Sequence, residues 1–231
     1  MKKILCLFCV CISFHAPSSA GLKEGMDAFN SGNYGVAIEE LTPYAKTGVV
    51  DAQVNLSLIY ASGKGFPKDD VQALFWARKA AEQGSHDAQF MLSIFYNAGV
   101  GTPKDTTTGL FWCLKAAENG NGIAQTRLGY MYLAGDDVPP NDEKGVYWSR
   151  KAAAQVIHPE SALVNLAAFY IQPGKRRNLA YAYFLFNAAI ANGAKYEKSR
   201  DTLKTKLTQK EVKKAESLIA SWKPGTPLPL P

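Results

Sequence analysis

The chain has 231 residues, of which 47% are hydrophobic and 20% charged, with a formal net charge of +6. This composition is typical of a globular protein and is long enough for one or two domains with a buried core. The positive charge is modest, and its basic residues gather in Lys175, Arg176, Arg177 and the last fifty residues, which is typical of a solvated face. A nucleic-acid partner is therefore not expected.

Residues 1–20 are predicted to be a cleavable secretory signal. Lys2 and Lys3 precede an apolar run over residues 4–14, and small residues follow up to Ala20. A membrane anchor is the alternative, but a spanning helix needs about 20 apolar residues and this run is shorter. We expect cleavage before Gly21, export to the periplasm or out of the cell, and no membrane span in the mature chain.

Removal of the signal leaves 24 basic and 20 acidic residues, a net charge of +4, and a single cysteine, Cys113. An intramolecular disulfide is then impossible, even in an oxidising compartment. Cys113 follows Trp112 within a predicted helix, so we expect it to behave as a small buried hydrophobic residue.

One sequence motif of ten residues recurs at an interval of 36 residues. FWARKAAEQG at residues 75–84 returns as FWCLKAAENG at 111–120 and, more loosely, as YWSRKAAAQV at 147–156. Repetition at such a period indicates stacked structural units. The recurring positions are Trp76, Trp112, Trp148 and Phe184; Lys79, Lys115 and Lys151; and the alanine pairs 80–81, 116–117, 152–153 and 188–189.

Each unit predicts a helix, a turn and a second helix. In the first helix Ala, Leu and Tyr recur at i, i+4 and i+8, which is one helical face. Glycines and a proline then stop this helix, and Asp69, Asp105 and Asn141 stand where the second helix needs an N-terminal cap. The stripe residues are Ala52, Leu56 and Tyr60; Ala88, Leu92 and Tyr96; Ala124, Leu128 and Tyr132; and, displaced by 38, Ala162, Leu166 and Tyr170.

A single helical pair cannot bury its apolar face, whereas stacked pairs bury a continuous core. The repeated pattern, A-x-x-x-L-[SG]-x-x-Y-x-x-G followed by D-x-x-x-[AG]-x-x-W-x-x-K-A-A, resembles the Sel-one-like repeat of the tetratricopeptide superfamily. The resemblance covers residues 48–193 as four repeats, and residues 21–47 look like a degenerate tetratricopeptide-like opening unit. It implies an all-α, right-handed α-solenoid that works as an exported protein-interaction adaptor or scaffold.

The C-terminal residues are predicted to close the stack. Thr208 and Glu211 fit a capping box, and an apolar stripe ending at Trp222 follows, so residues 194–222 are expected to cap the last repeat. Residues 223–231, KPGTPLPLP, are expected to form a flexible extended tail, with a polyproline ligand as the alternative.

Catalytic chemistry has little support in the sequence. After signal cleavage only His86 and His158 remain, both expected as exposed turn residues, and no catalytic motif, metal-ligand spacing or cofactor site is recognised. Lys46-Thr47-Gly48 matches one triplet of penicillin-recognising enzymes, and some secreted relatives of the repeat family are said to bind such compounds. We interpret the triplet as a helix end, and a cell-wall-active or penicillin-binding enzyme stays as the alternative function.

A second stripe on the first helices predicts a binding groove. In the tetratricopeptide superfamily the equivalent offsets line the concave surface that holds a peptide, although packing between neighbouring units would also explain apolar residues there. The predicted partner is a protein or peptide segment, with two aspartates available for a basic group. The groove residues are Asp51, Val54, Leu58, Asp87, Phe90, Ile94, Asn97 and Tyr130.

Overall fold

The computed structural model describes residues 19–155, 159–174 and 177–231. These residues form twelve helices and no strand, which confirms the all-α prediction. The helices are α1 (Ser19–Asn30), α2 (Tyr34–Lys46), α3 (Val50–Ser62), α4 (Asp70–Glu82), α5 (His86–Ala98), α6 (Thr106–Glu118), α7 (Gly122–Ala134), α8 (Asp142–Ala153), α9 (Glu160–Ile171), α10 (Leu179–Ala191), α11 (Glu197–Lys204) and α12 (Gln209–Ser221).

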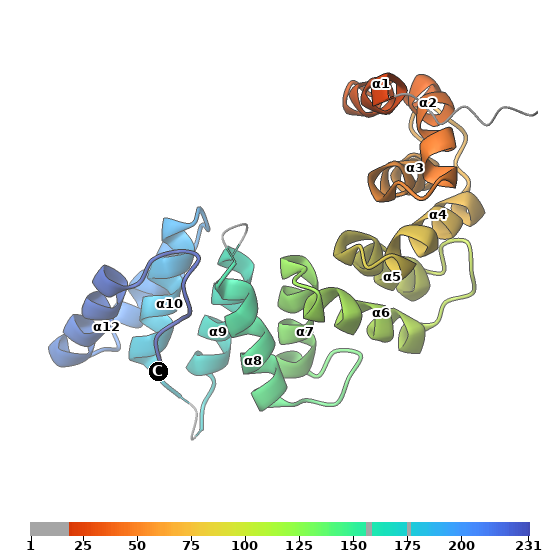
Figure 1. Ribbon diagram of the computed structural model, residues 1–231. Helices are drawn as coiled ribbons and strands as arrows, with labels where there is room; N and C mark the ends of the chain where they lie inside the picture. The colour runs from red at the N-terminus through yellow and green to blue at the C-terminus, as the bar shows by residue number, and fades with distance from the viewer. Residues whose placement is uncertain (1–18, 156–158, 175–176) are drawn as a thin grey trace, which may run out of the picture.

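The helices pack as consecutive antiparallel pairs. α3 with α4, α5 with α6, α7 with α8 and α9 with α10 are the four repeat units, and α1 with α2 precedes them. Figure 1 shows the pairs stacked along an arc, with α3, α5, α7 and α9 on its inner side and α4, α6 and α8 on its outer side. The expected α-solenoid is confirmed, and the first helix of each unit faces the inside of the curve.

Glycine ends the first helix in three units, as predicted. Gly63, Gly99 and Gly135 are the C-caps of α3, α5 and α7 and adopt left-handed φ values of 62°, 75° and 73°. Glycine is favoured there because a β-carbon makes this conformation costly for other residues. The fourth unit differs: the C-cap of α9 is Gln172, which has φ −53°.

The predicted N-caps of the second helices are also confirmed. Asp69 accepts hydrogen bonds from the backbone N–H groups of Val71 and Gln72, and Asp105 accepts one from Thr108. Asn141 caps α8 in the same way, and Asn178 caps α10. In every unit the cap residue also donates its own N–H to the carbonyl of the stripe tyrosine, at 2.8–3.0 Å, so the turn is tied to both helices.

The apolar core is distributed along the stack. The Ala and Leu stripe positions of all four units are fully buried, and the paired alanines of the second helices are at most 3% exposed. Buried residues fall into four clusters, each shared by neighbouring helices. Stability therefore arises from contacts within a unit and with its neighbours, as expected for a repeat protein.

The recurring lysines contact aromatic rings. Trp76 and Trp148 are buried, while Phe75, Phe111 and Tyr147, one residue earlier, are exposed. The ammonium of Lys79 lies 5.8 Å from the centre of the Phe75 ring, and Lys115 and Lys151 lie over the equivalent rings. The repeated motif thus combines a tryptophan that packs in the core with an exposed cation–π pair, formed by the lysine and the preceding aromatic residue, on the outer helices.

Two predictions for the C-terminal region have different outcomes. The capping box is confirmed, since Thr208 and Glu211 exchange both hydrogen bonds at the start of α12. The flexibility of the tail stays a prediction: most of residues 223–231 are exposed, but Leu228 is only 4% exposed and anchors the segment to the solenoid. The anchor forms because Leu228 joins the apolar core of the last units while backbone carbonyls beside it accept hydrogen bonds.

Candidate functional site

Three of the predicted groove residues form an exposed row on the inner helices. Leu58, Ile94 and Tyr130 occupy the same position in α3, α5 and α7, and their exposed fractions are 41%, 47% and 49%. Large apolar side chains aligned at such exposure have a binding use more often than scattered ones do. We call Leu58, Ile94 and Tyr130 the inner row.

Val54 and Phe90 belong mainly to the packing between units. Val54 of α3 is half-buried against the cluster formed by α4 and α5, and Phe90 of α5 is half-buried against the cluster centred on α6 and α7. For these two residues the apolar character is thus explained by packing between neighbouring units. The side chains of Val54 and Phe90 are therefore poorly placed to contact a partner.

Asn97 is also engaged within its own unit. It is half-buried, and its side-chain oxygen occupies the space in front of Gly109, where an added β-carbon would overlap it. Asn97 thus lies at the α5–α6 contact. Asp51, by contrast, is exposed in the first turn of α3.

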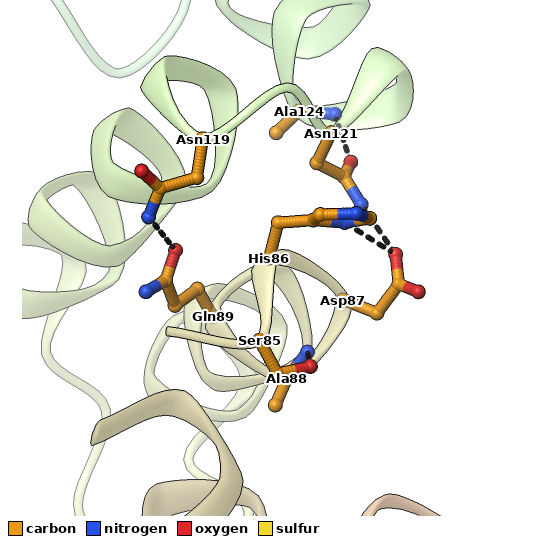
Figure 2. A network of polar contacts seen from close by, with 8 residues as sticks. All are labelled: Ser85, His86, Asp87, Ala88, Gln89, Asn119, Asn121 and Ala124. Atoms are coloured by element: carbon orange, nitrogen blue, oxygen red, sulfur yellow. Dashed lines mark hydrogen bonds and ion pairs between the residues drawn. The ribbon is translucent and has the colours of Figure 1, made fainter. Parts of the chain in front are cut away.

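Asp87 joins two consecutive units. One of its carboxylate oxygens accepts a hydrogen bond from Nδ2 of Asn121 at 2.8 Å and lies 3.0 Å from Nδ1 of His86 (Figure 2). Asn121 in turn caps α7 by accepting from the N–H of Ala124 at 2.8 Å. The carboxylate predicted for a basic partner group is thus already used at the junction between α5 and α7, although it remains exposed.

A series of buried amides repeats at the same junctions. Gln89 donates to the carbonyl of Ala81 in the preceding unit. It also accepts from Asn119 at the end of its own unit, as Figure 2 shows. Gln53 and Gln125 make the equivalent pairs of contacts. In the fourth unit this position is Leu163, which is fully buried and makes an apolar contact instead.

An open hollow of about 910 Å³ lies at the end of the inner row. Tyr130, Leu133, Asn165, Ala168 and Phe169 are among the residues that line it. Ala168 occupies the row position in the fourth unit, where a small side chain leaves space. This hollow is not among the features predicted from the sequence, although two signals indicate it: alanine at the row position and the shorter turn after α9.

The residues considered for catalysis are accounted for structurally. Lys46 and Thr47 stand at the end of α2, and the Thr47 hydroxyl donates to the carbonyl of Tyr44 at 2.9 Å. Gly48 follows with φ 98°, so the triplet is a helix end, as predicted. His86 is the first residue of α5 and not part of a turn, while His158 lies outside the described residues.

Cys113 is buried at the α6–α7 contact, as predicted, and its Sγ lies 3.9 Å from the carbonyl of Ala124. Burial raises the pKa of its thiol. Across residues 19–155, 159–174 and 177–231, no cluster of three or more metal-ligating side chains occurs. No helix in this part of the chain has both the length and the hydropathy needed to cross a bilayer.

Comparisons with known proteins agree with this architecture. A Sel1 repeat protein from Oxalobacter formigenes has a similar structure, with a TM-score of 0.69 and 25% identity over 75% of this chain and 70% of that one. The protective antigen c5321 of uropathogenic Escherichia coli, which displays an SLR fold, gives a TM-score of 0.50 and 26% identity over 86% of this chain. The match spans about half (51%) of the c5321 chain. No curated protein matches the sequence significantly.

The family model of the Sel1 repeat matches four segments, residues 50–85, 86–121, 122–156 and 161–193. These segments coincide with the helical pairs α3–α4, α5–α6, α7–α8 and α9–α10. Proteins built from this repeat generally act as protein-interaction modules. Because the matched segments cover more than half of the sequence, the chain belongs to the Sel1 repeat family.

Proposed function

We propose that this protein is an exported, non-enzymatic adaptor that binds a peptide or protein segment on the inner face of the solenoid. The observation that carries the proposal is the inner row together with the hollow beside Tyr130. Leu58, Ile94 and Tyr130 each present a partly exposed apolar surface, and the hollow has room for a bulky side chain of the partner.

Charge adds a second element to this surface. Asp51 lies exposed on α3, the same helix as Leu58, and its carboxylate is available to a Lys or Arg of the partner. Asp87 already uses one of its carboxylate oxygens, Oδ1, for Asn121 and His86, so a partner group would have to share that oxygen or bind the other one. A partner segment with apolar side chains and a basic group near one end fits this arrangement best.

Export rests on the N-terminal sequence. Lys2, Lys3 and the apolar run over residues 4–14 are typical of a secretory signal. Fractionation of cells and N-terminal sequencing of the exported protein test this part of the proposal. Cytoplasmic protein that still begins at Met1 would contradict it.

A photo-crosslinking residue introduced at position 130 tests the binding surface directly. The matched control carries the same residue at position 111, because Phe111 is equally exposed (50%) but lies on the outer helix α6. We expect a partner adduct from position 130 and none from position 111. Adducts of the same partner at both positions, or at 111 alone, would show that the inner face is not the binding surface.

Charge substitutions provide an independent test. Ile94→Asp with Tyr130→Asp should abolish partner capture, whereas Phe111→Asp with Tyr147→Asp, which changes equally exposed residues of the outer helices, should preserve it. Circular dichroism melts of both variants should stay cooperative, since none of the four side chains is buried. Incubation with a labelled penicillin tests the enzyme alternative, and we expect no covalent adduct.

A further inference from the structure

Residues 223–231, the Pro-rich tail, return from α12 across α10 and end beside it (Figure 1). Arg150 of α8 donates hydrogen bonds to the carbonyls of Leu228 and, at 3.1 Å, of Pro229. The Tyr181 hydroxyl of α10 also donates to the Pro229 carbonyl, at 2.8 Å, and accepts from Arg150 at 3.1 Å. Two side chains of different units thus hold two consecutive backbone carbonyls of the tail.

Aromatic rings surround these donors. Tyr181 packs edge-on against Tyr170 at 5.0 Å between ring centres and lies 5.5 Å from Phe184, which meets Trp222 at 6.1 Å. Trp222 also donates its indole N–H to the carbonyl of Thr226 at 3.2 Å. The two leucines of the tail differ sharply: Leu228 is 4% exposed and Leu230 is 82% exposed. One leucine therefore anchors the tail and the other does not.

This arrangement has the chemistry of a receptor for extended proline-containing segments. Proline has no N–H to donate, so a segment of alternating leucine and proline offers mainly carbonyl acceptors and apolar rings. Donors such as arginine and tyrosine on an aromatic-lined surface complement both features. We propose that the Arg150–Tyr181 surface is a binding site for a leucine–proline segment of a partner protein, and that the chain's own tail occupies it as a tethered competitor.

The tail is suited to displacement because few contacts hold it. Leu228 is its one buried side chain in residues 223–231, and the hydrogen bonds from Arg150 and Tyr181 reach only two of its carbonyls. The short connection to α12 nevertheless gives it an effective concentration of about millimolar at its own site. A free segment must overcome this competition. The site lies on α8 and α10, away from the inner row, so the proposal does not depend on the adaptor function.

The experiment measures the binding of a fluorescein-labelled peptide, PGTPLPLP, by fluorescence anisotropy to full-length variants. Leu228→Asp should release the tail, and Leu230→Asp is the matched control because its side chain is already exposed. We expect the Leu228→Asp protein to bind the peptide about tenfold more tightly than the wild type or Leu230→Asp, which retain the competitor. Adding Tyr181→Phe to Leu228→Asp should weaken this binding several-fold, because only the hydroxyl donor is lost.

Three results would overturn the proposal. If a folded Leu228→Asp protein does not bind the peptide, the tail has only a structural role and the surface is not a binding site. Equal binding by the wild type and Leu228→Asp would place the peptide on another surface. A wild-type dimer that Leu228→Asp abolishes would show that the site takes the tail of a second copy and not a partner segment.

Discussion

Asn97 and Gly109 share one packing site, in which a β-carbon added to Gly109 would overlap Oδ1 of Asn97. One unit earlier the same two positions are Ala61 and Ala73. A larger residue on the first helix is thus matched by a glycine on the second, whereas two alanines coexist. The packing site therefore limits the combined volume of the two side chains, and not the volume of either side chain alone.

Gly109→Ala should therefore lower the free energy of unfolding by about 1 kcal/mol, since overpacking costs more than the better helix propensity of alanine gains. Asn97→Ala combined with Gly109→Ala recreates the Ala61–Ala73 pair and should restore stability. The control is Gly35→Ala in α2, where an added β-carbon meets no atom within 4 Å and should not destabilise. Urea denaturation measures all three, and an unrescued double variant would refute the paired constraint.

Gln125→Ala should destabilise the fold by about 2 kcal/mol, because it removes two hydrogen bonds from a fully buried site. The carbonyl of Ala117 would lose its side-chain donor, and Gln155 would lose its acceptor. Gln72→Ala, on the exposed surface of α4, should change stability by less than about 0.5 kcal/mol. Equal effects of the two substitutions in thermal melts would argue against the buried amides as a source of stability.

Ala168→Tyr should fill the hollow and reduce partner binding about tenfold, which corresponds to about 1.4 kcal/mol. Ala168 is exposed, so the melting temperature should not fall. Val71→Tyr, at an exposed position of α4, is the control. Crosslinking yield from position 130 or a titration with the identified partner reports the result, and unchanged binding by Ala168→Tyr would exclude the hollow from the contact.

The stability of the fold should decrease between pH 10 and 12 because of Tyr181. Burial is the main cause that raises the pKa of this phenol from 10.0 to about 12. Above pH 10 the unfolded chain releases the proton while the folded chain keeps it, so rising pH favours unfolding. The loss should approach about 2 kcal/mol by pH 12.

Urea denaturation of the wild type and Tyr181→Phe at pH 9.5 and 11.5 isolates this contribution, because the other titrating groups are common to both proteins. Tyr181→Phe should be less stable at the lower pH, since a donor to Pro229 is lost, but should lose less stability on going to the higher pH. Parallel losses in the two proteins would show that Tyr181 does not titrate differently in the folded state.

Periodic features of the fold were predictable because each is repeated in the sequence. The buried alanines and leucines, the glycine stops and the caps at Asp69, Asp105 and Asn141 each recur at 36 residues, and recurrence in several units rules out chance coincidence. The inner row was predictable for the same reason. Its neighbours Val54 and Phe90 were not separable from it, because an apolar residue in a stacked helix has the same pattern whether it faces a partner or the next unit.

Features that occur once were missed. The contact between Arg150 and Pro229 joins residues far apart in sequence, and no equivalent contact occurs in the other units within the described part of the chain. The hollow depends on Ala168 and on residues 172–174 after α9, where the fourth unit departs from the pattern. Such contacts follow from three-dimensional proximity alone, and no repeated pattern in the sequence indicates them.

The buried amides have a consequence for how the protein can change in length. Gln53, Gln89 and Gln125 each require only a carbonyl from the unit before and an amide at the end of their own unit. A duplicated copy of residues 86–121 inserted after residue 121 would meet compatible groups at both of its ends. The junction before α9, where Leu163 replaces the glutamine, offers no such match. The inner surface can therefore be extended by whole units before α7, while the hollow and the Arg150–Tyr181 surface stay with the last two units.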